Sequence, residues 1–307
     1  MQNNVASVKS SEQSFLVGLI GAGIQASLTP AMHEREGTEQ GLRYVYKLID
    51  LEKLGVGAEA LAELLIAAER TGFAGLNITY PCKQSVIPLL SDLSDDARAL
   101  GAVNTVVLRD GRRIGHNTDW WGFTQSFRRG LPDVQRDRVV QLGAGGAGAA
   151  VAHAALTLGV QHLTIFDLDA SRSQRLAAEL TARFGRGRST AGTDLRDAMA
   201  KADGMIHASP TGMAKLPGLP LPADQLRPQL WIAEIVYFPL ETELLRAAKG
   251  IGCRTLNGGG MAVFQAAEAF RLFTGIAPDA ERMLRHFDSM TASPPLPDPL
   301  PRGKREI

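Results

Sequence analysis

Residues 139–148 read VVQLGAGGAG, an apolar run that passes directly into the pattern Gly-x-Gly-x-x-Gly. An Ala-rich segment, Ala149–Leu158, follows it. In such a strand–turn–helix unit the first glycine permits a tight turn, the second lets a pyrophosphate approach the backbone, and the third lets helix and strand pack closely. The helix N-terminus then offers N–H groups and a positive dipole end to phosphate. We therefore expect dinucleotide contacts from Gly143, Ala144, Gly145, Gly146, Ala147 and Gly148.

Asp167, at the end of the next apolar run, supports the same prediction. It lies about 20 residues beyond the glycines, where an acidic side chain accepts hydrogen bonds from the ribose hydroxyls and repels a 2′-phosphate, so it favours NAD over NADP. Arg172 is the counter-argument, because an arginine near this position can accommodate the 2′-phosphate. A glycine-rich turn used only for packing is the structural alternative. The joint presence of strand, helix and acidic residue argues against it.

Short apolar runs alternate with amphipathic segments along the chain, which implies βαβ units and a mostly parallel sheet. We expect strands at Phe15–Gly21, Tyr44–Leu51, Ala74–Ile78, Val103–Leu108, Val139–Gly143, Leu163–Asp167, Gly204–Ala208 and Trp231–Val236. We expect helices at Ala58–Arg70, Asp119–Arg129, Ala147–Gly159, Ser171–Phe184, Asp194–Ala202, Glu241–Lys249, Met261–Thr274 and Pro278–Asp288. The turn Asp110-Gly111 predicts a hairpin with Arg112–Gly115 as its return strand. The predicted fold class is α/β: an N-terminal, mostly parallel α/β substrate domain and a Rossmann-type, doubly wound dinucleotide-binding domain.

A chain of 307 residues fits two domains of roughly 150 residues each. We expect a substrate-binding and catalytic domain over residues 1–118 and an NAD-binding domain over residues 119–255. Two helices within residues 256–290 are expected to fold back onto the first domain. Residues 291–307 contain five prolines and few apolar residues, so this tail should be disordered.

Composition excludes several classes of protein. Lys plus Arg number 33 and Asp plus Glu 32, so the formal net charge is +1, which argues against a nucleic-acid-binding surface spread over the whole molecule. No apolar run approaches the ~18–20 residues of a membrane span, and the polar N-terminus lacks the core of a signal peptide. Two cysteines, Cys82 and Cys253, cannot form a disulfide framework or supply a zinc site alone. We expect a cytoplasmic monomer or homodimer with a small-molecule substrate, no nucleic-acid or membrane partner and no metal.

A second glycine turn, Gly21-Ala22-Gly23, follows the first predicted strand. Ser27-Leu28-Thr29-Pro30 interrupts the pattern after it, and Pro30 suits the start of a helix. Hydroxyls beside helix N–H groups suit a small carboxylate or polyol better than a pyrophosphate. We therefore treat the turn as a decoy and expect Ser27 and Thr29 to bind substrate. The alternative is that either residue is merely an N-cap.

Polar side chains follow other strand ends of the first half, where ligands of open α/β sheets bind. They are Asn77, Thr79, Lys83, Asn104 and Asp119. Lys83 and Asp119 could form a proton-transfer dyad, in which the carboxylate orients the ammonium and the lysine shuttles a proton at a substrate hydroxyl. The alternatives are a surface lysine and an aspartate that only caps a helix.

Loops of the second half face the expected cofactor. Contacts are expected from Ser209, Pro210, Thr211, Met213, Val236, Gly258 and Met261. The loop around Gly258 opens the helix that carries Met261 and Gln265. Met261 also fits a packing role, whereas Gln265 could reach substrate if this helix returns to the cleft.

Taken together, these motifs resemble the shikimate/quinate dehydrogenase family over about Phe15 to Asp288. The matching stretches are GLIGAGIQASLTPAMH (Gly18–His33), GLNITYPCK (Gly75–Lys83), GAVNTV (Gly101–Val106), NTDWWG (Asn117–Gly122), Gly143–Gly148, Ala208–Met213, VYFPLETELL (Val236–Leu245) and Met261–Gly275. Their order and spacing make the resemblance specific.

The resemblance implies reversible oxidation of the C3 hydroxyl of shikimate or quinate to the 3-dehydro product, with hydride passing to a nicotinamide. It places Lys83 and Asp119 on the family's catalytic pair. It places Ser27 and Thr29 on the carboxylate-binding hydroxyls. The groups that contact ring hydroxyls correspond to Asn77, Thr79, Asn104 and Gln265.

Three features resemble the NAD-dependent quinate/shikimate dehydrogenases in particular. Many NADP-dependent biosynthetic members carry Ser where this chain has Thr29, and Arg, Ser or Thr where it has Asp167-Leu168-Asp169. The third feature is Pro30–Gly37, PAMHEREG. We expect an NAD-dependent enzyme and leave open its shikimate or quinate preference, residual NADP use, and whether it serves aromatic biosynthesis or quinate catabolism. An aminoshikimate-type dehydrogenase and a non-catalytic dinucleotide sensor are the alternatives.

Overall fold

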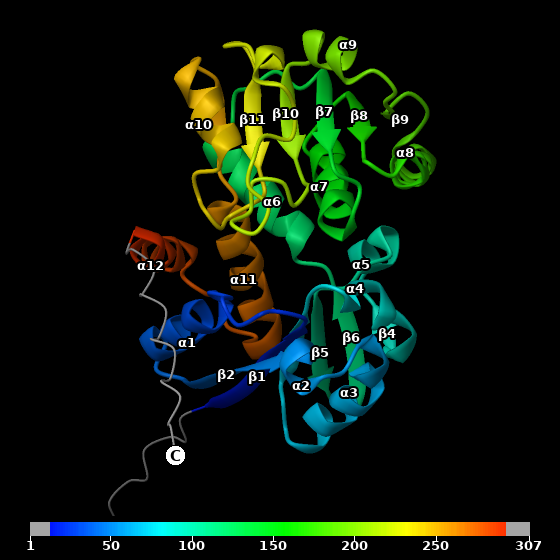
Figure 1. Cartoon of the computed structure of the whole chain (residues 1–307). Coiled ribbons are helices and arrows are strands. Elements are labelled where there is room, and N and C mark those ends of the chain that lie inside the picture. The colour runs from blue at the N-terminus through cyan, green and yellow to red at the C-terminus, as the bar shows by residue number, and fades with distance from the viewer. Residues whose placement is uncertain (1–12, 293–307) are drawn as a thin grey trace, which may run out of the picture.

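The computed structural model describes residues 13–292, which form two lobes, each built around a six-stranded sheet (Figure 1). The N-terminal lobe contains β1 (Ser14–Gly21), β2 (Arg43–Asp50), β3 (Gly75–Ile78), β4 (Asp92–Leu93), β5 (Thr105–Arg109) and β6 (Arg112–His116). The C-terminal lobe contains β7 (Arg138–Leu142), β8 (His162–Phe166), β9 (Ser189–Ala191), β10 (Gly204–His207), β11 (Trp231–Glu234) and β12 (Arg254–Leu256). The predicted α/β class is confirmed.

Helices connect these strands and cover the sheets. Those before the second sheet are α1 (Thr29–Glu39), α2 (Leu51–Leu54), α3 (Leu61–Arg70), α4 (Cys82–Ser85), α5 (Asp95–Leu100) and α6 (Asp119–Gly130). The later ones are α7 (Gly146–Thr157), α8 (Ala170–Phe184), α9 (Leu195–Ala200), α10 (Glu243–Gly250), α11 (Gly259–Thr274) and α12 (Ala280–Ala292).

The N-terminal sheet has the order β2-β1-β3-β5-β6-β4. β1 pairs in parallel with β2 and β3, whereas β5 is antiparallel to both β3 and β6. The β5–β6 hairpin turns at Asp110 and Gly111, whose φ angles of 53° and 70° match a two-residue type I′ turn. The predicted hairpin is therefore confirmed.

The C-terminal sheet is parallel throughout, in the order β12-β11-β10-β7-β8-β9. Side chains alternate across a strand, so Val139 packs toward α7 and α8 while Val140 packs toward α9 and α10. Both faces are thus covered, as in a doubly wound fold. The strand order reverses between β7 and β10, and the crevice at such a switch point is where open α/β sheets bind ligands.

Helix α11 returns the chain to the N-terminal lobe. Its Phe270 and Phe273 pack into the apolar core of the N-terminal sheet. Helix α12 joins α1 through Glu36, a buried carboxylate that lies 2.7 Å from Arg282. At Gly122 of α6, a Cβ would come within 2.6 Å of a carbonyl oxygen of α11, so these two helices pack closely.

The structure contains three strands that were not predicted, and one prediction lies mostly outside the described residues. The strands β4, β9 and β12 have two or three residues each, too few for a periodic signal. Helix α12 continues through Ala292, so the first two residues of the predicted tail, 291 and 292, are helical. The rest of that tail and the polar N-terminus lie outside the described residues. Within residues 13–292 no helix is long and apolar enough to cross a membrane, and no cluster of His, Cys, Asp and Glu is arranged to hold a metal ion.

Candidate active site

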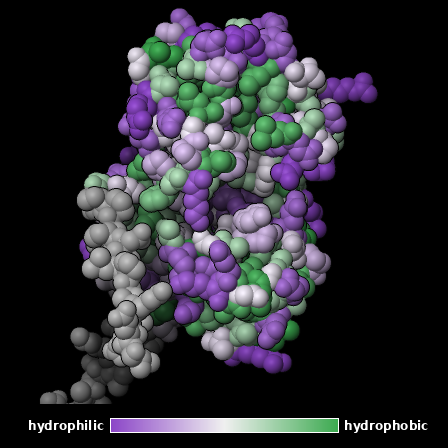
Figure 2. All heavy atoms as spheres, in the orientation of Figure 1, coloured by the Kyte–Doolittle hydropathy of each residue, from purple (hydrophilic) through white to green (hydrophobic). Residues whose placement is uncertain are grey.

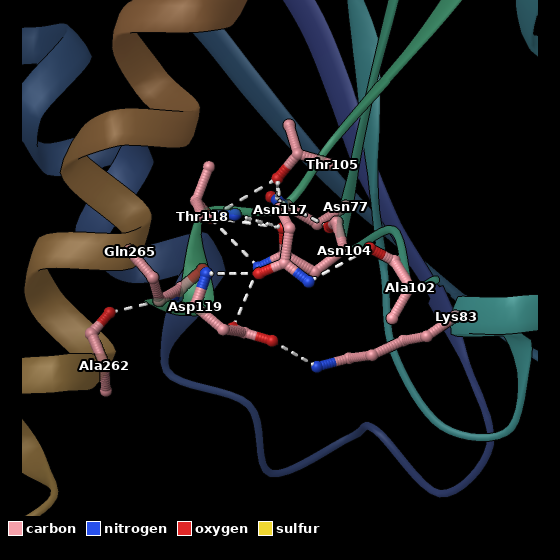
Figure 3. Close-up of polar contacts among 10 residues, drawn as sticks. All are labelled: Asn77, Lys83, Ala102, Asn104, Thr105, Asn117, Thr118, Asp119, Ala262 and Gln265. Atoms are coloured by element: carbon pink, nitrogen blue, oxygen red, sulfur yellow. Dashed lines mark hydrogen bonds and ion pairs between the residues drawn. The ribbon is translucent and has the colours of Figure 1, made fainter. Parts of the chain in front are cut away.

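Lys83 and Asp119 meet at the edge of the N-terminal lobe (Figure 3). Lys83 lies in the one-turn helix α4 after Pro81, and Asp119 is the first residue of α6, both as predicted. Lys83 Nζ donates to Asp119 Oδ2 at 2.6 Å, and the two side chains are 21% and 11% exposed. An ammonium that a carboxylate orients and that solvent still reaches can exchange a proton with a bound hydroxyl.

A buried network fixes the Asp119 carboxylate. Asn104 Nδ2 donates to Asp119 Oδ1 at 2.8 Å and to Thr118 Oγ1 at 2.9 Å. Asn104 Oδ1 accepts the Thr118 N–H at 2.7 Å, and Asn117 Oδ1 accepts the Asp119 N–H at 3.1 Å. One carboxylate oxygen thus faces Asn104 and the other faces Lys83, so the dyad is oriented before any substrate binds.

Asn77 extends this network along β3. Its Nδ2 donates to Thr105 Oγ1 at 3.0 Å, and its Oδ1 accepts the Tyr46 hydroxyl at 2.7 Å. Thr79 lies beside the first glycine turn, because a Cβ at Gly21 would stand 2.3 Å from Thr79 Cγ2. The structure therefore brings the predicted Asn77 and Asn104 into one network with Asp119 and places Thr79 beside the first glycine turn.

Asp50, at the end of β2, accepts hydrogen bonds from the N–H groups of the first glycine turn. Its carboxylate accepts the Gly23 N–H at 2.9 Å, the Ile24 N–H at 3.2 Å and Gln25 Nε2 at 2.9 Å. The hydrogen bond from Gln25, together with the backbone bonds, outweighs burial and holds the pKa of Asp50 below its usual value. Backbone donors that a pyrophosphate would need are occupied, which gives a physical reason for treating this turn as a decoy.

Ser27 and Thr29 stand at the start of α1. Thr29 is the first helical residue, and its N–H donates to Ser27 Oγ at 3.3 Å. The N-cap residue is Leu28, so the alternative that either hydroxyl is the N-cap is wrong, although Ser27 does accept one backbone N–H. Both hydroxyls lie at the positive end of the α1 dipole, which favours an anionic group.

The second glycine turn has the geometry of a phosphate site. Helix α7 begins at Gly146, directly after Gly145, and no side chain in residues 13–292 caps it, so its first N–H groups remain available. A Cβ at Gly143 would stand 2.4 Å from the Ala208 carbonyl oxygen, and one at Gly148 would stand 2.4 Å from that of Gly143. No atom of the described residues lies within 4 Å of a Cβ at Gly145. Two glycines thus permit close packing, and the third borders open space.

Two carboxylates and an arginine stand at the end of β8. Asp167 Oδ2 accepts the Ala144 N–H at 2.7 Å, which ties this carboxylate to the glycine turn. Asp169 caps α8, and its hydrogen bonds from Ser171 hold the pKa of its carboxyl below the usual range. The Arg172 guanidinium lies 3.6 Å from Asp169, so the group that could meet a 2′-phosphate already faces a negative charge.

One of the loops predicted to face the cofactor lies against the second glycine turn, and two others lie against each other. A Cβ at Gly143 would stand 2.9 Å from the Ser209 nitrogen, so the loop after β10 lies against it. A Cβ at Gly258 would stand 2.7 Å from the Val236 carbonyl oxygen, so the loop before α11 lies against the loop after β11. The other residues predicted on these segments are Pro210, Thr211, Met213 and Met261, of which Met261 packs against the core of the C-terminal lobe.

The two lobes approach each other where the dyad meets the second turn. A Cβ at Gly146 would stand 3.9 Å from Lys83 Cδ. Burial, followed by the negative charge of Asp119, raises the pKa of Tyr237, which follows β11. Figure 2 shows a recess with hydrophilic residues between the lobes. The Lys83–Asp119 pair and the second glycine turn therefore lie next to each other, one on each side of the boundary between the lobes.

Some residues of this site escape sequence reasoning. Asn117 and Thr118 directly precede Asp119 in the chain; Asn117 accepts the Asp119 N–H, and Thr118 accepts from Asn104, so their place in the sequence could have indicated them. Tyr46 comes from another strand, and no local signal marks it. Gln265, predicted at the substrate, lies on α11 on the side of Asp119, and its Nε2 donates to the Ala262 carbonyl oxygen at 2.9 Å (Figure 3).

Three segments of the chain match models of known families. Residues 19–106 match the shikimate dehydrogenase substrate binding domain, and residues 258–286 match the shikimate 5'-dehydrogenase C-terminal domain. Residues 126–223 match the alanine dehydrogenase/PNT C-terminal domain.

Whole-chain comparisons agree with these matches. A shikimate dehydrogenase (NADP(+)) of Streptomyces avermitilis is 62% identical over 89% of this chain and 94% of its own. A quinate/shikimate dehydrogenase (NAD(+)) of Corynebacterium efficiens is 50% identical over 90% of this chain and 99% of its own. The solved structure of quinate dehydrogenase from Corynebacterium glutamicum in complex with NAD matches with a TM-score of 0.86 and 49% identity, over 91% of this chain and all (100%) of the other. The protein is an oxidoreductase of the shikimate and quinate dehydrogenase type that uses a nicotinamide dinucleotide, and it belongs to the shikimate dehydrogenase family.

Proposed function

We propose that the protein reversibly oxidises the C3 hydroxyl of shikimate, quinate or both with NAD, and that Lys83 and Asp119 form its acid–base dyad. The observation that carries the proposal is the 2.6 Å contact between Lys83 Nζ and Asp119 Oδ2, beside the start of α7. Substrate binds to residues 1–118 together with the helices of residues 256–290, and NAD binds to residues 119–255.

Each part of the site has a role in this proposal. Ser27 and Thr29 hold the substrate carboxylate, and the ring hydroxyls meet Asn77, Thr79, Asn104 and Gln265. Bound NAD supplies the hydride acceptor. Lys83 takes the proton that leaves the C3 hydroxyl and returns it in the reverse direction, while Asp119 keeps the ammonium oriented. Acid–base help of this kind contributes roughly 10²–10⁴ in rate.

Replacing Lys83 tests the dyad. Lys83→Ala should lower kcat at least about a hundredfold, because the proton acceptor is lost, while the affinity for NAD stays close to normal. Lys53→Ala is the matched control, because Lys53 lies in the other one-turn lysine-bearing helix, α2, and is exposed. Initial rates with shikimate and quinate, beside calorimetric NAD binding, supply both readouts. Near-normal turnover of Lys83→Ala would reject the dyad.

The preference for NAD rests on the charges at the end of β8. A 2′-phosphate there would meet Asp167 and Asp169, whereas Arg172 already faces Asp169. The two named relatives divide on this point, one being an NADP(+) enzyme and one an NAD(+) enzyme. Initial rates with both cofactors decide the question, and a higher kcat/KM with NADP would refute the proposal.

Asp167→Asn sharpens that test. The amide oxygen can still accept the Ala144 N–H, so the glycine turn keeps its shape while one negative charge disappears. We expect the ratio of kcat/KM for NADP to that for NAD to rise about tenfold, equivalent to roughly 1.4 kcal/mol. Asp110→Asn in the β5–β6 hairpin is the control and should leave the ratio unchanged. An unchanged ratio in Asp167→Asn would remove Asp167 from cofactor selection.

Thr29 bears on the choice between shikimate and quinate. If Ser27 and Thr29 hold the carboxylate, the methyl and hydroxyl groups of Thr29 lie beside C1, where quinate carries an extra hydroxyl. The values of kcat/KM for both acids, in the wild type and in Thr29→Ser, measure its contribution, and a large shikimate preference in the wild type would reject a dual role. Aminoshikimate belongs in the same assay. A chain that binds NAD but oxidises none of these acids would be a sensor.

A further inference from the structure

Gln141 is a fully buried polar residue of β7, two residues before the first glycine of the second turn. Its Nε2 donates to the Gly143 carbonyl oxygen at 2.8 Å and to the Gly148 carbonyl oxygen at 2.9 Å. One side chain therefore joins the first and the last glycine of the Gly-x-Gly-x-x-Gly pattern. The roles proposed above do not involve this residue.

The orientation of the Gln141 amide follows from its two partners. A backbone carbonyl oxygen only accepts hydrogen bonds, so the atom that contacts both carbonyls is the amide nitrogen, which has a hydrogen for each of them. Gln141 Oε1 is buried and has no hydrogen-bond partner within residues 13–292. Neither an amide nor a backbone carbonyl titrates, so these donor and acceptor roles do not depend on a protonation state.

The amide allows the two ends of the turn to approach each other. The Gly143 and Gly148 oxygens both lie within 2.9 Å of one nitrogen, and without it two partial negative charges would face each other. A Cβ at Gly148 would also stand 2.4 Å from the Gly143 oxygen. The closed shape of the turn thus depends on a glycine at position 148 and on the Gln141 amide.

The same contacts separate the acceptors of the turn from its donors. The carbonyls of Gly143 and Gly148 are bound to a side chain that is 0% exposed, so they face the interior. Asp167 holds the Ala144 N–H at 2.7 Å, and the N–H groups at the start of α7 remain available. A phosphate needs such donors and is repelled by carbonyl oxygens, so this division suits an anionic ligand.

We propose that Gln141 is a positioning residue for the cofactor: its amide holds the Gly143 and Gly148 carbonyls inward and so keeps the free N–H groups of the turn directed at the pyrophosphate. The inference rests on the proposed function in taking NAD to bind residues 119–255 with its pyrophosphate at this turn. The unpaired Oε1 fits such a role. Burying an acceptor without a partner costs stability, which an apolar side chain would avoid, so the two carbonyls account for an amide at this place.

Gln141→Met tests the proposal, because methionine has a similar length and no hydrogen to donate. The probes are the dinucleotide that the wild type prefers and its fragment without the nicotinamide ring, which is ADP-ribose in the case of NAD and keeps the pyrophosphate. Calorimetry should show a Kd about tenfold higher for both probes, as the loss of one net hydrogen bond implies. KM for the dinucleotide should rise by a similar factor, while kcat at saturating dinucleotide and KM for shikimate stay close to normal.

Two control variants separate positioning from stability. Gln161→Met removes another amide that donates to a glycine carbonyl, that of Gly159 at 3.0 Å, on the surface just before β8. Val140→Ala opens space in the core on the opposite face of β7 and should lower the free energy of unfolding. Both variants should bind the two probes with wild-type affinity, because neither changes the turn.

The outcomes separate this inference from the proposed function. An unchanged Kd in Gln141→Met would overturn the inference, and so would a rise that Val140→Ala reproduces or a rise for the dinucleotide that its fragment does not share. Tenfold weaker binding of both probes in a chain that oxidises neither shikimate nor quinate would support the inference and reject the proposed function.

Gln141→Asn keeps the test decisive if Gln141→Met fails to fold. It retains an amide on a side chain one methylene shorter, which cannot lie between both carbonyls. Its Kd for both probes should therefore rise, by less than tenfold. Wild-type affinity in Gln141→Asn would show that the bridge between the two glycines is not needed for the cofactor.

Discussion

The two Gly-Ala-Gly turns of the molecule begin alike. In the N-terminal lobe the buried strand β1 leads into the turn, and the adjacent parallel strand β2 ends at Asp50. In the C-terminal lobe β7 leads into the turn, and the adjacent parallel strand β8 is followed directly by Asp167. Asp50 accepts the Gly23 N–H in the first turn, and Asp167 accepts the Ala144 N–H in the second. The carboxylate that supports the turn is therefore common to both lobes.

The turns differ in how many donors remain for a ligand. Asp50 accepts two consecutive N–H groups and the Gln25 side chain, and α1 starts only at Thr29. In the second turn, α7 starts at Gly146 with its first N–H groups uncapped by any described side chain. A glycine pattern therefore predicts a dinucleotide site only when the helix begins at once and its N–H groups are left for phosphate.

The largest effect should come from Gly148 in the second turn. A Cβ in Gly148→Ala would stand 2.4 Å from the Gly143 carbonyl oxygen. Because the contact is between two backbone segments, neither can move away without a large cost in free energy. We expect a loss of about 3 kcal/mol in the free energy of unfolding, the upper end for overpacking, together with weak dinucleotide binding. Urea unfolding and calorimetry measure the two effects.

Gly145→Ala is the matched control in the same turn. Because no described atom lies within 4 Å of its Cβ, the free energy of unfolding should stay within about 0.5 kcal/mol of the wild type. Dinucleotide affinity should nevertheless fall, since the methyl group takes the space that a pyrophosphate needs. If both variants were equally destabilised, the division between packing and binding glycines would be wrong.

Features that depend on residues close together in the chain could be predicted from the sequence, whereas features that depend on the pairing of distant strands could not. The second turn needs only a strand, three glycines and a helix that follow one another, so residues 139–158 were enough. The Lys83 and Asp119 roles came from strand-end position and family resemblance. Their contact depends on β3 pairing with β5 and β5 with β6, which the alternation of strands and helices alone does not specify.

The remaining features depend on register between strands far apart in the chain. Asp50 reaches the first turn because it lies opposite Gly21 across β1 and β2. His207 meets Glu234 because β10 and β11 align those two residues. A single sequence carries no direct signal for such alignments, so neither the contacts of Asp50 with the first turn nor the contact between His207 and Glu234 was predicted.

The helices that follow the two turns each bury a histidine, His33 in α1 and His153 in α7. Burial lowers the pKa of His33 to about 3, and burial with the charge of Arg183 lowers the pKa of His153 to about 4. Unfolded histidines have a pKa near 6.5, so between pH 7 and pH 5 these two residues bind protons in the unfolded chain but stay neutral in the folded chain. The free energy of unfolding therefore falls as the pH falls. For His33 the loss should be about 2 kcal/mol in the free energy of unfolding.

Urea unfolding at the two pH values measures this loss. His33→Phe should remove the His33 share of the pH dependence, because no imidazole remains to take a proton. In the wild type, His33 Nδ1 lies 2.9 Å from the Tyr44 hydroxyl, and both His33→Phe and Tyr44→Phe remove this contact. Because Tyr44→Phe keeps the imidazole, it should lower the free energy of unfolding at both pH values and leave its pH dependence intact. Equal pH dependence in the wild type and His33→Phe would contradict a neutral His33 in the folded lobe.

The smallest effect should come from Asp50, and it tests whether the first turn serves substrate rather than cofactor. Asp50→Ala leaves the Gly23 and Ile24 N–H groups without their acceptor, so the turn and the hydroxyls of Ser27 and Thr29 beyond it should shift. We expect KM for shikimate to rise about tenfold, as the loss of one or two buried hydrogen bonds implies, with NAD affinity unchanged.

Asp50→Asn keeps one acceptor oxygen, so its KM should lie between those of the wild type and Asp50→Ala. Removing the carboxylate frees the donors of the first turn but does not move the start of α1 back to the glycines, so neither variant should gain a second dinucleotide site. A change in NAD affinity with KM for shikimate unaltered would place the first turn on the cofactor side. The helix start would then not be what separates the two turns.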